Sequence, residues 1–196
     1  CAPIIGYADW KDTKLYSCGK AAMNMSICID SSDPKNIPGE VLVKGPNVFL
    51  GYYKNEEATA EVMDKDGWFH TGDMGVMDDE GFLFLKGRSK CMILGPSGQN
   101  IYPEEIEGVL NNVTYVVDSL VVEDHGTLVS LIYPDYHQAE LDGLSKSELE
   151  AKLQEALPEI NKQIPNYAKI TKMEFMPEDF ERTPKRSIKR YLYQRN

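Results

Sequence analysis

The first part of the chain alternates apolar and polar residues over short stretches. In "NIPGEVLVKGPNVFLGYY", Val41 and Val43 fall on one side of an extended segment that glycines punctuate. The stretch "WFHTGDMGVMDDEGFLFLKGR" predicts two strands joined by a turn at residues 78–81. Between these stretches, Asn55 stands where a helix N-cap belongs, before the acidic first turn of "EEATAEVM". We therefore predict a β-rich subdomain over residues 1–88.

After "GRSK" the pattern changes, because helical periods begin to separate the strands. "CMILGPSGQNIYPEEIEGVLNN" indicates a strand, a glycine loop and a helix with Pro103 at its first position. "VDSLVVEDHGTLVSLIYP" predicts a hairpin, and "SKSELEAKLQEALPEINKQI" predicts a helix that Ser145 and Glu148 open as a capping box. "AKITKMEFMP" predicts one more strand. Residues 89–196 are thus expected to form a compact α+β domain with its own core, and the chain is assigned to the α+β class.

Composition narrows the class of protein. The four cysteines show neither C-x-x-C spacing nor histidine-rich neighbours, so we interpret them as reduced packing residues of a cytoplasmic protein. The three histidines share no spacing that suggests a metal site, and no metal ligand is predicted. No apolar run approaches the roughly 18–20 residues that a membrane helix needs. The start, "CAPIIGYADW", has no signal-peptide pattern and no initiator Met, so we expect a processed chain or a piece of a longer one.

The charge is distributed unevenly along the chain. The last fifteen residues, "RTPKRSIKRYLYQRN", contain six cations and no acid. Since the formal net charge is −10 and this tail contributes +6, residues 1–181 carry −16. The strongly negative charge of residues 1–181 argues against nucleic-acid binding, because nucleic acids bind to basic surfaces. The tail is predicted to meet a small anion, and the alternative is a solvated basic end of a helix.

Two stretches carry residues suited to binding a nucleotide. In "HTGD", Asp73 follows a Thr-Gly turn, where its carboxylate could accept hydrogen bonds from the two hydroxyls of a ribose. The alternative is an Asx-type turn in which Asp73 bonds only to nearby backbone. Arg88 directly follows the next predicted strand, so its guanidinium could reach the same sugar or a phosphate.

The glycine loop in "LGPSGQN" is the second candidate. Gly98 and its neighbours precede a helix N-terminus, which permits close approach of a ligand to the backbone. The alternative is an ordinary connection between a strand and a helix. Neither a G-x-x-x-x-G-K-[ST] phosphate loop nor a G-x-S-x-G nucleophile motif occurs in the chain.

The order of these stretches is more specific than any one of them. "GEVLVKGPNVFLGYY", "WFHTGD", "GRSKCMILGPSGQNIYPEEIE", "INKQIPNYAKI" and "RTPKRSIKR" together resemble the closing blocks of the adenylate-forming superfamily, over about residues 39–190. That superfamily contains acyl-CoA synthetases, luciferases and peptide-synthetase adenylation domains. "GRSK" and "IYPEEIE" are most similar to long-chain fatty acyl-CoA synthetases. The expected function is therefore that of a long-chain fatty acid–CoA ligase.

The resemblance implies a reaction in two steps. A carboxylate attacks ATP, with Mg2+, to give an acyl-adenylate and pyrophosphate, and coenzyme A then displaces AMP. Asp73 and Arg88 would hold the ribose, Lys90 would be the hinge of a mobile domain spanning residues 89–196, and Gly98 would line the entry for coenzyme A.

The resemblance also implies that this chain is a C-terminal fragment. The family's phosphate-binding loop and magnesium motif would lie before Cys1, so the fragment alone is expected to be inactive. Its expected partners are the missing N-terminal part of the same protein and the small substrates. Membrane association would come only through a long acyl substrate.

One departure from the family affects the tail. The family ends in a pattern like T-P-x-x-K-I-x-R, whose lysine reaches the phosphates of ATP, whereas "TPKRSIKR" places Ser187 at that position. The interpretation favoured here is that Lys185 takes over that catalytic role, and the alternative is that Arg186 does so or that the first step is impaired.

Two further interpretations of the function of the whole chain stay open. One is another acid–thiol ligase (aryl, medium-chain or carrier-protein loading), and the other is a degenerate, non-catalytic interaction module.

Overall fold

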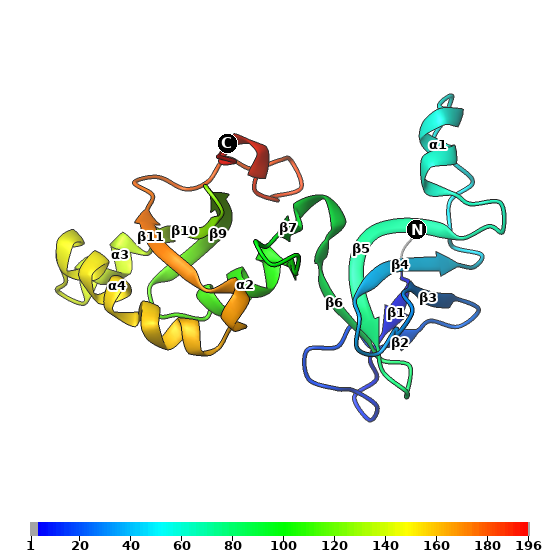
Figure 1. Ribbon diagram of the computed structural model, residues 1–196, viewed down its shortest axis with the longest axis horizontal. Helices are drawn as coiled ribbons and strands as arrows, with labels where there is room; N and C mark the ends of the chain where they lie inside the picture. Colours follow the sequence, from blue (N-terminus) through cyan, green and yellow to red (C-terminus); the bar gives the residue numbers. More distant parts are fainter. Residues whose placement is uncertain (1–3, 196) are drawn as a thin grey trace. The chain divides into compact units, whose positions relative to one another are not determined.

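The computed structural model describes residues 4–195 and divides the chain into two compact units. The first unit is Cys1–Lys90 and the second is Cys91–Asn196, so the division falls two residues after the expected boundary at residue 88. Both units combine strands and helices, as the α+β class requires (Figure 1).

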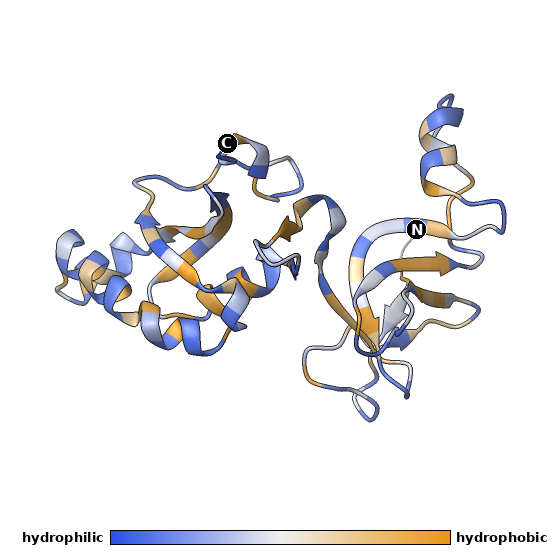
Figure 2. Ribbon diagram, viewed as in Figure 1, coloured by the Kyte–Doolittle hydropathy of each residue, from blue (hydrophilic) through white to orange (hydrophobic). Residues whose placement is uncertain are grey.

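The first unit is built on an antiparallel sheet. Within residues 4–195, this sheet has four strands in the order β3-β4-β5-β6, namely β3 (Ser26–Asp30), β4 (Gly39–Lys44), β5 (Phe69–Met77) and β6 (Leu83–Arg88). Val41 and Val43, predicted on one side of a strand, are both buried. They pack with Met25, Ile29 and Leu83 into the core of this unit, and apolar residues mark these strands in Figure 2. The period-two pattern is therefore explained by one covered face.

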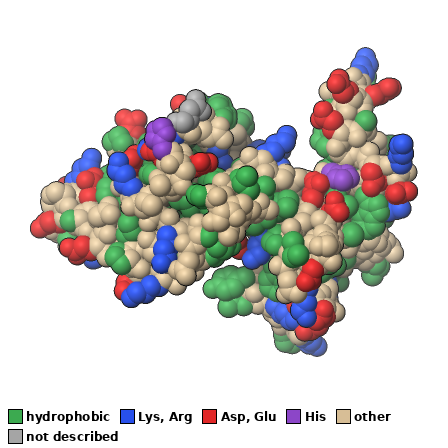
Figure 3. Space-filling model, viewed as in Figure 1, with side chains coloured by type: hydrophobic (Ala, Val, Ile, Leu, Met, Phe, Trp, Pro, Cys, Tyr) green, Lys and Arg blue, Asp and Glu red, His purple; other side chains and the backbone are tan. Residues whose placement is uncertain are grey.

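The smaller elements of the first unit lie outside this core. A two-stranded pair joins β1 (Gly6–Tyr7) to β2 (Lys20–Ala21), and the helix α1 (Glu56–Val62) connects β4 to β5. The side chain of Asn55 caps α1 by accepting a hydrogen bond from the backbone N–H of Ala58 at 3.0 Å. No residue of α1 is buried, and acidic side chains are exposed around it in Figure 3.

The second unit is built on a mixed sheet. In the described part of the chain this sheet has three strands, β9 (Val116–Asp124), β10 (Thr127–Pro134) and β11 (Ile170–Phe175). β9 and β10 form the predicted antiparallel hairpin, and β11 joins β10 in parallel. A short pair, β7 (Ile93–Leu94) with β8 (Asn100–Ile101), flanks the glycine loop before the helices.

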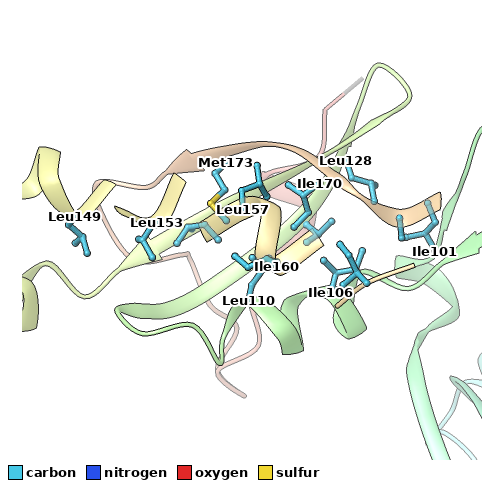
Figure 4. Packing of buried hydrophobic residues seen from close by; sticks show 14 of the residues in the cluster. Ile101, Ile106, Leu110, Leu128, Leu149, Leu153, Leu157, Ile160, Ile170 and Met173 are labelled. Carbon is cyan, nitrogen blue, oxygen red and sulfur yellow. The ribbon is translucent and has the colours of Figure 1, made fainter. Parts of the chain in front are cut away.

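Helices cover one face of this sheet. They are α2 (Pro103–Leu110), α3 (Tyr136–Leu141) and α4 (Lys146–Lys162), and their buried side chains meet Val121, Leu128 and Ile132 of the strands (Figure 4). The predicted capping box at Ser145 and Glu148 is confirmed at the start of α4. None of the helices in residues 4–195 combines the length and the apolar content that a bilayer crossing requires.

The chain's own tail covers the opposite face. Phe180 is 3% exposed and packs on Leu120, Val122, Val129 and Leu131, with Ile188 and Tyr193 beside it. Residues 120–122 thus point alternately to the helices and to the tail, which explains why the strands are continuously apolar instead of alternating. The tail is an integral layer of the second unit.

Arginines fix this tail to the strands and to α2. Arg182 pairs with Asp118 of β9 at 2.6 Å, and Arg195 pairs with Asp124 of β9 at 3.0 Å and Glu174 of β11 at 2.5 Å. Arg190 pairs with Glu107 of α2, a carboxylate that is only 7% exposed. The basic character of the tail therefore serves, in part, to attach it to an acidic body.

The contacts of Glu174 make the stability of the second unit depend on pH. Hydrogen bonds from Arg195 and then Lys172 lower the pKa of Glu174 from 4.5 to about 2. A lowered folded-state pKa adds stability above pH 4.5, and this contribution is lost as the pH falls from 4.5 toward 2. Because solvent screens the half-exposed pair, we expect Glu174→Gln to cost about 1–2 kcal/mol at pH 7 and nothing near pH 2.

Urea unfolding of the chain at pH 7, 5 and 3, followed by circular dichroism, measures this dependence. Glu155→Gln, at an exposed position of α4, is the matched control and should change stability little at any of these pH values. A cost for Glu174→Gln that stays constant from pH 7 to pH 3 would contradict the assignment.

Candidate nucleotide-binding site

The "HTGD" stretch forms a tight turn inside β5. The hydroxyl of Thr71 donates to the backbone oxygen of Val41 at 2.8 Å and accepts from the backbone N–H of Asp73 at 3.0 Å. Gly72 has φ +72°, a left-handed conformation that glycine adopts without a steric penalty. Thr71 therefore shapes the turn before Asp73 through the hydrogen bonds of its hydroxyl, and Gly72 does so through its left-handed backbone.

Glu40 on the neighbouring strand supports this turn, although it was not singled out from the sequence. One carboxylate oxygen accepts from the backbone N–H of Gly72 at 2.9 Å, and the other lies 2.9 Å from Nδ1 of His70. These contacts join residues about 30 positions apart, so they depend on the register of β4 against β5. The only local indication of a role for Glu40 was that it is the one charged residue in the otherwise apolar "GEVLV".

Asp73 and Arg88, both proposed from the sequence, are brought together. They are directly opposite each other in the β5–β6 ladder, and Nη1 of Arg88 donates to Oδ1 of Asp73 at 2.5 Å. Both side chains reach solvent, with exposed fractions of 33% for Asp73 and 58% for Arg88. Among the described residues, no donor is hydrogen-bonded to Oδ2 of Asp73. The pair thus presents a carboxylate oxygen able to accept from a hydroxyl, and the Asx-type turn is not formed.

Lys90 and Gly98 lie apart from this pair along the chain. Lys90 is exposed within a short 3₁₀ helix, Ser89–Cys91, and is the last residue of the first unit. Gly98 closes the loop between β7 and β8, where its N–H donates to Gly95 at 2.9 Å and its φ is +82°. No heavy atom lies within 4 Å of a Cβ built at Gly98, so the loop surface is open. The hinge role of Lys90 and the coenzyme A role of Gly98 stay predictions.

The tail departs from its main path in a short loop over residues 183–187. The backbone N–H of Thr183 donates to Ser187, and that of Arg186 donates to Thr183, both at 2.8 Å. An isolated bridge between Arg182 and Ile188 closes the base of the loop. Lys185, at its tip, and Ser187, where the resemblance implies a lysine, are both exposed.

The structure separates the six cations of the tail into two groups. Four have carboxylate partners, namely Arg182, Lys189, Arg190 and Arg195. Within residues 4–195, no carboxylate is in ion-pairing distance of Lys185 or Arg186. The expectation that the whole tail meets an anion is therefore too broad, since only the loop presents uncompensated charge. This arrangement could bind a phosphate chain.

For the magnesium ion that the resemblance implies, the described residues provide no cluster of three potential ligands among His, Cys, Asp and Glu.

Residues 92–196 match the family described as the AMP-binding enzyme C-terminal domain. A 2-succinylbenzoate–CoA ligase from Bacillus cytotoxicus is 45% identical over 118 residues, which are 59% of this chain and 24% of that protein. An indoleacetate–CoA ligase from Aromatoleum aromaticum is 43% identical over 126 residues, which are 61% of this chain and again 24% of the relative. The chain thus spans about a quarter of the length of these curated relatives.

Solved structures agree with this match. The O-succinylbenzoate coenzyme A synthetase from Bacillus subtilis, in complex with ATP and a magnesium ion, is 28% identical with a TM-score of 0.73. The similarity covers 91% of this chain and 35% of that structure, so it includes the larger part of both units. The chain belongs to the AMP-binding enzyme C-terminal domain family of the adenylate-forming superfamily.

Proposed function

We propose that this chain is the C-terminal part of an ATP-dependent acid–CoA ligase that forms an acyl-adenylate and then a coenzyme A thioester. The observation that carries this proposal is the loop of the second unit, where Lys185 and Arg186 have no carboxylate partner among residues 4–195. In the first unit, Asp73 separately has an oxygen available to a hydroxyl. A cationic loop suits the phosphates of a nucleotide, and a carboxylate acceptor, taken by itself, suits its ribose hydroxyls. Relatives named as CoA ligases support the same reaction class.

The residues of this chain would act in different ways. Asp73 accepts hydrogen bonds from the ribose hydroxyls, and Arg88, held beside it, limits the freedom of that carboxylate. Lys185 places positive charge where negative charge develops as pyrophosphate leaves, which is worth several kcal/mol when well positioned. Lys90 would absorb the backbone rotation between the two steps, and the Gly98 loop would line the path of the thiol.

The acid is proposed to carry an aromatic group. The relatives are named for 2-succinylbenzoate and indoleacetate, both of which contain an aromatic ring. A long-chain fatty acid is the second candidate, and it rests on the resemblance of "GRSK" and "IYPEEIE" to long-chain synthetases. The acyl pocket would lie in the part of the parent protein that precedes this chain, so a substrate panel is needed.

The test is ATP–pyrophosphate exchange by the intact parent protein with aromatic, medium-chain and long-chain acids, followed by thioester formation with coenzyme A. We expect exchange and thioester formation with at least one aromatic acid. Preference for a long-chain acid would contradict the proposed aromatic substrate but would still support the proposed acid–CoA ligase reaction. An absence of exchange with every acid would favour the non-catalytic interaction module.

A further inference from the structure

We propose that Arg182 is the positioning residue of the cationic loop, holding residues 183–187 so that Lys185 and Arg186 face the phosphates of the nucleotide. This inference rests on the proposed function, since it assigns the loop the same anionic target. It adds a residue that does not itself touch substrate but fixes the geometry of those that do.

The guanidinium of Arg182 joins three separate pieces of the second unit. Nη2 donates to Asp118 of β9 at 2.6 Å. It also donates at 3.0 Å to Asp179, which lies in the segment that leads into the loop. Nη1 donates across the loop to the backbone oxygen of Arg186 at 3.1 Å. A planar guanidinium spreads its donors over several nitrogens in fixed directions, so Nη1 and Nη2 of Arg182 reach acceptors in different places, whereas an ammonium group donates from one nitrogen only.

The contact with Asp118 connects the loop to the packed sheet of the second unit. Asp118 is on β9, opposite Tyr133 of β10, and the next residue, Ser119, is 1% exposed. Phe180, two residues before Arg182, is inserted between the tail and the sheet. Through Arg182 the loop is therefore tied to a packed sheet, although the loop itself is exposed.

Without this contact, little would fix the far side of the loop. Arg186 has φ +65°, a left-handed conformation that is uncommon for a residue with a side chain. The bond from Arg182 engages the carbonyl of this same residue, so it stabilises the left-handed turn at which Lys185 and Arg186 lie. Two backbone bonds within the loop do not anchor it to anything else.

The charges around Arg182 support an anchoring role instead of direct contact with phosphate. Asp179 and then Asp118 raise the pKa of Arg182 above its ordinary range, and Arg182 in turn lowers the pKa of Asp179. Two carboxylates already neutralise this cation, so it offers little net charge to an incoming anion. Lys185 and Arg186 have no carboxylate partner within residues 4–195, so they keep their positive charge for an anion.

The first experiment measures loop order in the absence of substrate. Trypsin cleaves after Lys185 and Arg186, and cleavage requires local opening of the loop. In the intact parent protein we expect Arg182→Gln and Asp118→Asn to speed cleavage at these bonds about tenfold. Arg195→Gln is the matched control, because it breaks a tail ion pair of similar exposure that does not touch the loop. Equal acceleration in the control, or none in Arg182→Gln, would overturn the proposal.

The second experiment measures the consequence for the reaction. Misplacing a catalytic group by about 1 Å can cost about 100-fold, so Arg182→Gln should lower ATP–pyrophosphate exchange 10- to 100-fold. Asp118→Asn should show the same defect more weakly, and thioester formation from supplied acyl-adenylate should stay within about threefold of wild type. Rescue of exchange by Arg182→Lys would instead indicate that the charge of Arg182 acts directly, which contradicts a positioning role.

The two experiments separate the inference from the function on which it rests. If the wild-type protein shows no exchange while trypsin cleavage responds as expected, the anchoring holds and the proposed function fails. If exchange occurs and Arg182→Gln leaves both readouts unchanged, the function stands and the positioning role is wrong.

Discussion

Replacing Asp73 by Ala in the intact protein is expected to reduce both the adenylation step and the thioester step by about 100- to 10,000-fold. The reason is that the ribose is present in both ATP and the acyl-adenylate, so under the proposed function one carboxylate would serve both steps. A hydrogen bond to a charged group contributes about 1.5–3 kcal/mol, and Asp73 would accept two. The loss should appear in ATP–pyrophosphate exchange and in conversion of supplied acyl-adenylate to thioester alike.

Two controls make this prediction specific. Asp73→Asn keeps one acceptor oxygen and should lose less activity than Asp73→Ala, because one hydroxyl is still satisfied. Asp66→Ala removes an exposed carboxylate from a nearby loop of the same unit and should leave both rates unchanged. A defect confined to exchange would instead place Asp73 at the phosphates or at the acid, and no defect would remove it from the site.

Local sequence signals predicted the starts of the helices well. The cap at Asn55, the capping box at Ser145 and the proline that opens α2 were all found where the pattern placed them. Each of these features is decided by residues within four positions of one another. The pairing of Asp73 with Arg88 was also within reach, since the two strands are joined by a short turn and the residues lie opposite each other.

Contacts between residues far apart in sequence could not be predicted in this way. Glu40 supports the turn before Asp73 only because β4 and β5 pair in one register, and a shift by one residue would direct its carboxylate to the other face. Its role became visible once the strands were aligned.

The tail shows the same limitation for charge. In sequence its six cations look equivalent, and a solvated basic end was a reasonable alternative. Ion pairs with residues 64 to 83 positions away distinguish Arg182 and Arg190 from Lys185. Packing of Phe180 brings those carboxylates within reach, so the division into structural and available cations follows from the core.

Replacing Lys185 by Ala in the intact protein is expected to lower ATP–pyrophosphate exchange by about 100- to 1,000-fold. Removing one preorganised group that stabilises developing charge typically has an effect of this size. Thioester formation from supplied acyl-adenylate should be nearly unchanged, because the phosphates have already left. Lys189→Gln is the matched control, since Lys189 is a tail cation whose ammonium is 3.0 Å from Glu181 and is therefore already compensated.

Introducing a lysine at position 187 tests whether positions 185 and 187 of the loop bind the same phosphates. Ser187→Lys in the Lys185→Ala background restores a lysine where the family places it, so it should recover at least part of the exchange. Recovery would show that the two positions serve the same phosphates and that the chain has displaced this contact by two residues. Normal exchange in Lys185→Ala alone would instead assign the role to Arg186, the remaining uncompensated cation of the loop in the described part of the chain.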